Sequence, residues 1–205
     1  MRSDLFTKNS QGKPTDAQPV ADTVYFLPIK TRVPLKFGPE ITTEVTCARV
    51  KVVAQDAQGR RAEGWGETPL SVQWVWPSSL SYEERHQAIK AFTLLIAERW
   101  VHESVQPGHP MEVGSRFLQA ELPRLLEQFN GKERAGKEPL PLLGGLVCAS
   151  AFDLALHDAY GKLHNLPIYQ TYSSIHLNYD LSHYLEPAEG SNVSFEGRYP
   201  ADFLK

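Results

Sequence analysis

The hydrophobic period of this chain changes once, near residue 80, and that change limits the folds the chain can adopt. Before it, Ala48, Val50, Val52 and Ala54 alternate with Arg49 and Lys51, which is the period of a half-buried strand. After it, apolar residues recur at the three- and four-residue spacing of a helix. These residues are Ile89, Phe92, Leu95, Ile96 and Trp100. Strands followed by helices predict an α+β fold.

Three strands are expected in the first part of the chain. Residues 24–29, VYFLPI, are rich in aromatic and branched side chains, and the alternating run around Val50 forms the second strand. Residues 56–59, DAQG, have turn composition, so residues 60–67 can return as the third strand. The sequence therefore predicts a three-stranded antiparallel meander.

Three helices are expected in the second part. Ser81 and the glutamate three residues later fit a capping box at the start of the first helix. The second helix begins near Pro110 and must kink or restart at Pro123, because proline has no backbone N–H to donate. The third helix runs from about Leu142 to about Leu163. The meander is therefore expected to be followed by a three-helix bundle.

The chain is expected to divide into three segments. Residues 1–21 are polar and contain proline, glutamine and aspartate, so we expect a mobile N-terminal tail. Residues 22–172 contain the strands and helices and form one domain. Residues 173–205 mix short aromatic pieces with proline, glycine and glutamate, and we expect them to be irregular.

Charge and cysteine content bear on partners and location. The net charge is −3 with both signs interspersed, which argues against a surface for nucleic acid or membrane. No uninterrupted apolar run reaches the roughly 18 residues of a membrane span, and the N-terminus lacks the apolar stretch of a secretory signal. Cys47 and Cys148 lie far apart, and each is expected to be a buried free thiol. We therefore expect a cytoplasmic protein.

Asp153 and His157 are the most chemically suggestive pair in the third helix. They are four residues apart, so their side chains lie on one face and can hydrogen-bond each other. They can be interpreted as metal ligands or as an acid–base pair. Two ligands fall short of the three or more that a divalent metal usually takes from protein, and buried polar groups normally find partners. We therefore interpret them as a structural polar pair.

The order of the motifs resembles the enolase superfamily, in its mandelate racemase and muconate-lactonizing branch. Residues 152–170, FDLALHDAYGKLHNLPIYQ, resemble the helix that joins cap to barrel in that family. His157 stands where tryptophan is common, and Asn165 where glycine is common. Residues 64–70, GWGETPL, resemble the end of the third cap strand, and residues 34–38, PLKFG, the loop after the first. The positions of the linking helix that match are Asp153, Leu156, Asp158, Gly161, Lys162, Leu166 and Pro167.

The resemblance implies Mg²⁺-assisted removal of a proton next to the carboxylate of a small molecule, in a dehydratase, racemase or cycloisomerase. The family's catalytic groups lie on a (β/α)₈ barrel of about 200 residues or more. Only 40 residues follow Asn165, and the sequence has no Lys-x-Lys pair. We therefore expect this chain to supply the cap, with residues 173–205 as the start of a truncated barrel region. We also expect it to hold no catalytic or metal-binding residue and to be inactive alone. We also expect a homo-oligomer, because a cap without its barrel exposes apolar helix surface.

Two cap loops close over the barrel mouth in that family, and residues 34–40 and 68–77 match them. The resemblance implies that Lys36 meets an anionic substrate, while Phe37, Trp74 and Trp76 exclude water. The alternative is that the tryptophans are packing aromatics and Lys36 is a solvated charge. For the whole chain, a second hypothesis is a non-catalytic α+β module that binds a partner or oligomerises through an exposed aromatic face.

Overall fold

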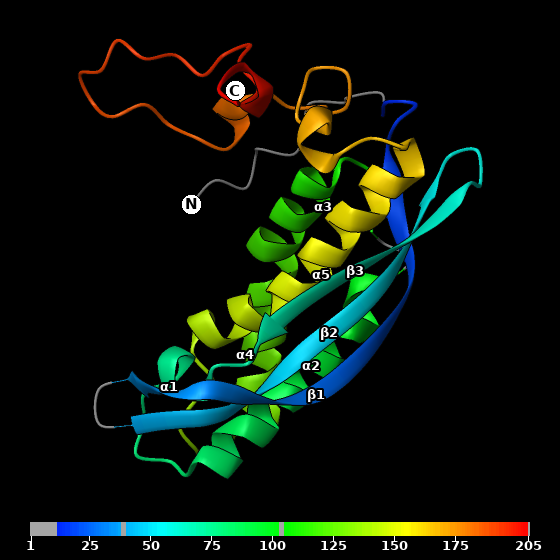
Figure 1. The fold of residues 1–205 in the computed structure, drawn as a ribbon. Helices are drawn as coiled ribbons and strands as arrows, with labels where there is room; N and C mark the ends of the chain where they lie inside the picture. Colours follow the sequence, from blue (N-terminus) through cyan, green and yellow to red (C-terminus); the bar gives the residue numbers. More distant parts are fainter. Residues whose placement is uncertain (1–11, 38–39, 103–104, 205) are drawn as a thin grey trace.

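The computed structural model describes residues 12–37, 40–102 and 105–204. Strands β1 (Ala17–Phe37), β2 (Glu40–Asp56) and β3 (Arg61–Pro69) form one antiparallel sheet in the order β1-β2-β3 (Figure 1). This arrangement confirms the predicted meander and, with the helices that follow, the α+β class.

Strand β1 begins earlier than the sequence pattern indicated. Residues 17–21 belong to the strand although they fall in the expected tail, while residues 1–11 lie outside the described residues. Ala17 pairs with Asp56 of β2, and it exchanges two backbone hydrogen bonds with Gly108, of 3.2 and 3.0 Å. These partners are distant in sequence, which is why the local composition gave no sign of the strand.

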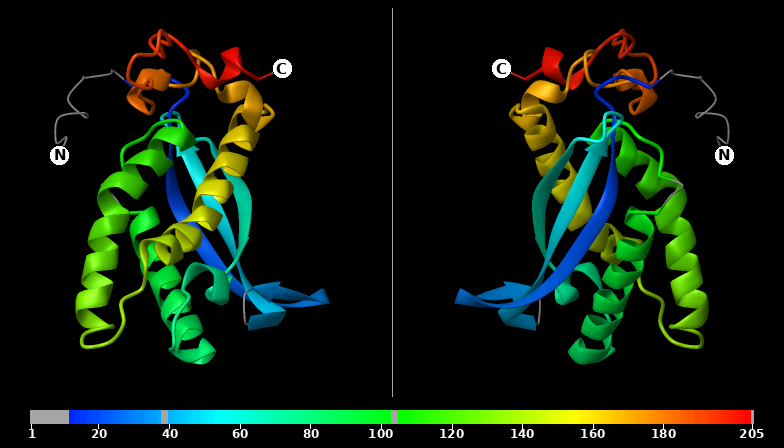
Figure 2. Two further views of the ribbon diagram at one scale, coloured as in Figure 1. Left: turned by 90° about the vertical axis from the view of Figure 1, so that its left-hand side faces the viewer. Right: turned by 90° about the vertical axis from the view of Figure 1, so that its right-hand side faces the viewer.

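The two faces of the sheet differ as the alternation predicted. Ala48, Val50, Val52 and Ala54 are all 0% exposed and form the core side of β2. The opposite face is solvated and carries two cross-strand ion pairs, Arg49 with Glu67 at 2.6 Å and Lys51 with Glu63 at 3.2 Å. The helices therefore pack on one face only (Figure 2).

The helices follow the predicted order. After a short helix, α1 (Val72–Val75), come α2 (Tyr82–Trp100), α3 (Pro110–Arg116), α4 (Leu122–Lys132) and α5 (Leu142–His164). At the start of α2 the Ser81 hydroxyl accepts a bond from the Glu84 N–H at 3.2 Å. The Glu84 carboxylate pairs with Arg134 at 2.9 Å, so no reciprocal capping bond is formed.

Pro123 widens the helix instead of breaking it. Residues Phe117–Glu121 form a π-helical turn, η1, between α3 and α4, and the Leu122 N–H donates to the Phe117 carbonyl five residues earlier. Such a turn accommodates a residue that cannot donate the normal helical bond. The predicted kink or restart at Pro123 is thus a π turn in a continuous helix.

Helix α5 lies between the sheet and the other helices. By length and composition its 23 residues could cross a membrane, but half of its most apolar window is buried in the fold, and core helices meet the same criterion. Its contact with β3 is close: a Cβ at Gly66 would stand 2.6 Å from the Ala155 nitrogen. Cys148 of α5 and Cys47 of β2 are both buried and free, as predicted.

The residues after α5 fold over the end of the helical layer that lies farthest from the β1–β2 hairpin tip (Figures 1 and 2). They contain three short 3₁₀ helices, η2 (Ile168–Thr171), η3 (Leu181–His183) and η4 (Pro200–Asp202). The segment is tied to α3 by the buried Glu112 carboxylate, which accepts from the backbone N–H groups of Asn178 and Tyr179 at 2.5 and 3.1 Å.

Candidate functional site

The two segments that resemble capping loops lie at the same end of the sheet. β1 and β2 extend beyond β3, because Leu35 still pairs with Thr42 whereas β3 ends at Pro69, opposite Cys47. The chain leaves β3 beside this β1–β2 hairpin and forms α1 (Figure 1). An antiparallel meander places the end of its first strand and the end of its third at the same end of the sheet. The described residues of the first segment, among them Leu35, therefore lie near residues 69–74 of the second.

A groove separates the hairpin arm from α1. It encloses about 220 Å³ and has mainly apolar walls. Trp74 is 54% exposed and Leu35 45% exposed, so two large apolar side chains face solvent across it. The groove is lined by Thr31, Leu35, Thr42, Val45, Pro69, Ser71, Gln73 and Trp74. Sequence reasoning found Trp74 but missed Leu35.

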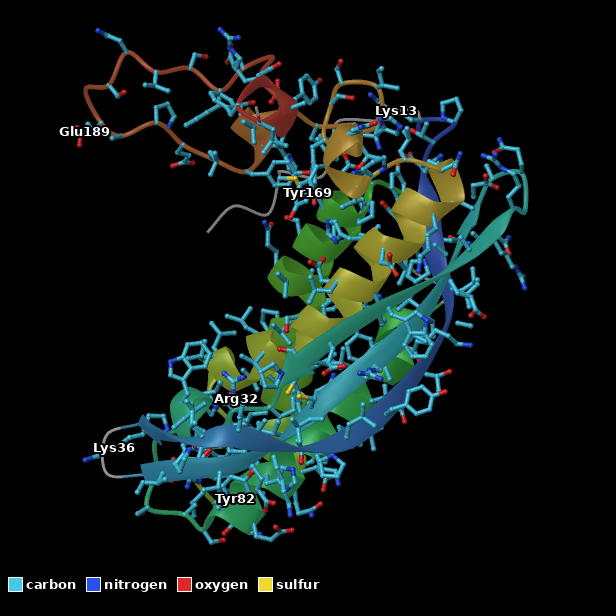
Figure 3. The ribbon with its side chains drawn as sticks, in the orientation of Figure 1. Lys13, Arg32, Lys36, Tyr82, Tyr169 and Glu189 are labelled. Atoms are coloured by element: carbon cyan, nitrogen blue, oxygen red, sulfur yellow. The ribbon has the colours of Figure 1, made fainter. Side chains whose placement is uncertain are left out.

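The charged side chains of the hairpin lie outside the groove. Lys36 is exposed on β1 and points away from the body of the protein (Figure 3). Arg32 is exposed on the same arm and was missed, although the recurring cations at Lys30 and Arg32 signal a basic strand face. Phe37 is the last residue of β1 and pairs with Glu40, but its side chain is outside the described part of the structure.

Trp76 supports this loop from the core. It is 2% exposed, its indole Nε1–H donates to Glu138 at 2.8 Å, and the Arg134 guanidinium lies 5.2 Å from its ring. Hydrogen bonds from Ser78 and Trp76 lower the pKa of the Glu138 carboxyl. Trp76 is therefore fixed by packing and hydrogen bonds, and Trp74 is the tryptophan of this loop that reaches solvent.

Asp153 and His157 lie on α5, away from the hairpin. The His157 Nδ1–H donates to the Asp153 backbone carbonyl at 2.8 Å, and the Asp153 carboxylate is 3.5 Å from the same nitrogen. Burial raises the pKa of Asp153, and His157 partly offsets this effect. The carboxylate also lies against Gly114 of α3, where an added Cβ would require the Asp153 side chain to move. These contacts join α5 to α3.

Asp158 joins α5 to the sheet. Its carboxylate accepts from the Trp65 backbone N–H at 2.8 Å and from the Lys162 ammonium at 2.7 Å. The first bond satisfies a donor on the free edge of β3, which no strand covers in the described residues. Within the described ranges no group of three or more His, Cys, Asp or Glu side chains could hold a metal ion.

No family model and no curated protein matches the chain. Solved structures do match it. A dipeptide epimerase from Enterococcus faecalis V583, complexed with Mg and the dipeptide L-Leu-L-Tyr, is 13% identical with a TM-score of 0.43, over 77% of this chain and 35% of that one. An enolase from Bradyrhizobium, complexed with magnesium and mandelic acid, is 14% identical with a TM-score of 0.43, over 76% and 34%.

A dipeptide epimerase from Cytophaga hutchinsonii, complexed with Mg and the dipeptide D-Ala-L-Val, is 18% identical with a TM-score of 0.42, over 76% of this chain and 33% of that one. The chain spans about a third of the length of the structures it matches. Because these TM-scores are below 0.5, the function is inferred from the sequence motifs and from the geometry of this chain.

Proposed function

We propose that this chain is the cap region of an enolase-superfamily enzyme of the mandelate racemase and muconate-lactonizing branch. The observation that carries the proposal is the position of residues 34–40 and 68–77. They match the two capping loops in sequence, and residues 34–37 of the first lie beside the second at one end of the sheet. The enzyme would remove a proton next to a carboxylate with the help of a metal.

The course of α5 supports the same arrangement. The helix ends at the side of the molecule opposite the hairpin, and its 23 residues span about 35 Å. A barrel strand that began beyond α5 and ran back along it would point its C-terminal end toward the hairpin. Active sites of such barrels lie at the C-terminal ends of their strands. The described residues after α5 contain no strand. The barrel is therefore proposed for the whole protein and is not observed in this chain.

In this arrangement the residues of the chain bind and shield the substrate. Trp74 and Leu35 exclude water from the reacting carbon, which strengthens the electrostatic interactions that stabilise the developing charge. Lys36 and Arg32 attract the carboxylate, and Trp76 holds the loop in position. The Mg²⁺ that the resemblance implies has no fitting ligand set among the described residues, so we derive no step through it.

We further propose that the enzyme acts in the cytoplasm as a homo-oligomer on a small carboxylate, without nucleic-acid or membrane partners. The support is the net charge of −3, with mixed signs, and the two buried free thiols. Exposed apolar side chains on α5 support oligomerisation, since Leu142 is 54% exposed and Leu154 50%.

The test is isotope exchange by the protein encoded by the complete reading frame that contains this chain. Incubated with Mg²⁺ in D₂O, it should exchange the α-proton of mandelate or of a dipeptide, followed by proton NMR. Trp74→Ala should raise KM by roughly 10- to 150-fold, because it removes an apolar contact worth roughly 1.5–3 kcal/mol. The matched control is Trp65→Ala, a 44% exposed tryptophan on the outer face of the sheet.

The proposal is contradicted if neither mandelate nor the dipeptide exchanges its α-proton. It is also contradicted if the Trp74 and Trp65 variants have equal kinetics. The non-catalytic module remains the second candidate, favoured by the same exposed apolar side chains of α5. It predicts no exchange together with self-association of the 205-residue chain, which sedimentation equilibrium measures. A monomer without exchange would contradict the enzyme and the self-associating form of the module.

A further inference from the structure

A second cavity, of about 280 Å³, lies at the far end of α2 from the hairpin. Its apolar lining includes Trp100, Val113 and Phe117, which are 2%, 4% and 5% exposed. Figure 3 labels Tyr82, the first residue of α2, near the hairpin, so Trp100 at the last position lies at the opposite end. The cavity is therefore separate from the groove beside Trp74.

Four parts of the chain meet at this cavity. They are the end of α2, the loop residues His102, Val105 and Gln106, helix α3 with its π turn, and Tyr179 from the segment after α5. Glu103 and Ser104, within this loop, are outside the described residues. The π turn brings Ala120 and Glu121 to the wall. Such turns recur at functional sites because they displace side chains from the regular helical positions.

Two guanidinium groups line the cavity. The Arg116 Nη2 donates to the Gln106 and Pro107 carbonyls at 2.7 and 3.3 Å, which fixes this side chain at the wall. Arg99 is exposed at the rim. Among the described residues neither arginine has a carboxylate partner within ion-pair distance. Glu121, the acidic residue of the lining, pairs with Arg124 at 3.5 Å.

A buried donor also lacks a partner here. The Trp100 indole Nε1–H is buried and has no acceptor in the described part of the chain. Its ring packs edge-on against Phe117, with 4.6 Å between the ring centroids. Buried donors almost always have a partner, from the protein or from something bound to it. Trp100 lines the cavity, so its indole N–H resonance reports on a ligand that packs against this wall.

We propose that this cavity binds a small molecule that has an apolar body and one carboxylate. The body packs against Trp100, Val113 and Phe117, and the carboxylate lies between Arg99 and Arg116. Guanidinium groups suit this role because their fixed N–H donors match the two oxygens of a carboxylate. Ligand pockets usually enclose about 300–1,000 Å³, so the ligand is small, the size of one ring with a short side chain.

The experiment titrates the purified 205-residue chain with phenylacetate as the probe. The readout is the Trp100 indole N–H resonance in a ¹H–¹⁵N spectrum, assigned with Trp100→Phe. We expect a saturable shift of this resonance. Arg99→Gln and Arg116→Gln should each weaken binding by about tenfold, because each removes a hydrogen bond to a charged group. Arg61→Gln, an exposed arginine on β3 with the same charge change, should bind as the wild type does.

Two further comparisons test the shape and the charge of the site. Ala120→Leu adds three carbons to the wall and should abolish the shift. Phenylacetamide keeps the ring but has no charge, so it should bind at least about tenfold more weakly. The proposal is overturned by a shift that stays linear up to about 10 mM, a very weak affinity. It is equally overturned if both arginine variants bind like the wild type, or if phenylacetamide binds as well as phenylacetate.

Discussion

Gly64 and Gly66 decide how closely α5 can lie on β3. Both face the stripe of small residues that α5 presents to the sheet, Ala151, Ala155 and Ala159. A Cβ at Gly66 would overlap the Ala151 carbonyl oxygen and come within 2.6 Å of the Ala155 nitrogen. Backbone atoms of a helix cannot move aside as a flexible side chain can. The glycines of the GWGE run are therefore required by packing.

We expect Gly66→Ala to lower the free energy of unfolding by about 3 kcal/mol, because the methyl group forces the helix away from the sheet. Urea denaturation followed by circular dichroism measures the change. Gly131→Ala in α4 is the control, since a Cβ there meets nothing within 4 Å. It should stabilise the protein by about 0.5–1 kcal/mol. Equal effects of the two substitutions would refute the packing argument.

Asn165 stands where glycine is common in the superfamily that the sequence resembles, and the structure explains why asparagine fits there. It ends α5 with φ of 53°, the left-handed conformation that favours glycine, and its N–H donates to the carbonyls of Gly161 and Lys162. Asparagine tolerates this conformation better than most residues with a side chain. The substitution of asparagine for glycine therefore preserves the turn that follows α5.

At the scale of the element, His109 fixes the start of α3. Its Nδ1 accepts from the Met111 N–H at 3.1 Å, and its Nε2–H donates to the Thr171 hydroxyl at 2.9 Å. The Thr171 hydroxyl in turn donates to the Ile168 carbonyl at 2.6 Å. The imidazole is thus neutral in the native state. Burial, together with the smaller effects of the neighbouring histidines, lowers the pKa of His109 to about 2.

The depressed pKa of His109 predicts a loss of stability in mild acid. Below pH 6.5, roughly the ordinary histidine pKa, the unfolded chain binds a proton that the folded chain excludes. The free energy of unfolding should therefore fall by up to about 1.4 kcal/mol per pH unit between pH 6 and pH 4. Urea denaturation at several pH values measures this slope.

His109→Asn tests the assignment, because asparagine can still cap the helix but does not titrate. This variant should be less stable at pH 7.5, since it loses the bond to Thr171, and its stability should depend less on pH. His102→Asn, at an exposed position, should leave the slope unchanged. A His109→Asn slope equal to that of the wild type would show that other groups cause the acid sensitivity.

At the scale of the whole molecule, Glu112 joins the helical layer to the segment after α5. Its carboxylate accepts four hydrogen bonds, from the backbone N–H groups of His109, Asn178 and Tyr179 and from the Asn178 side chain. Asp16 accepts a further bond from the same Asn178 side chain at 2.9 Å. Asp16, near the start of the described chain, and Asn178, in the segment after α5, are thus hydrogen-bonded beside Glu112.

Glu112→Gln should release the segment after α5, because an amide offers one acceptor oxygen and turns N–H donors toward the others. We expect cleavage within residues 172–204 by a low concentration of chymotrypsin to become about tenfold faster, while the body of the protein stays intact. Mass spectrometry identifies the fragments. Glu127→Gln, on the exposed side of α4, should cleave like the wild type. An unchanged rate for Glu112→Gln would mean that other contacts hold the segment.

The sequence by itself determined the class of fold and the order of its elements. Alternation around Val50 and helical spacing around Phe92 are local properties, and each follows from the geometry of one element. The same reasoning located α5 within one residue of its observed end. It failed at the start of β1, because Ala17 is ordered by Asp56 and Gly108, which are distant along the chain.

Only the tertiary structure decided which residues can meet a ligand. Trp74 and Trp76 look alike in the sequence, but one is 54% exposed and the other 2%. The groove of Leu35 and Trp74 joins two separate loops, and the cavity of Arg99, Arg116 and Tyr179 joins four parts of the chain. Periodicity states which face of an element is buried. It does not state which distant element covers that face, and this pairing is what creates a binding site.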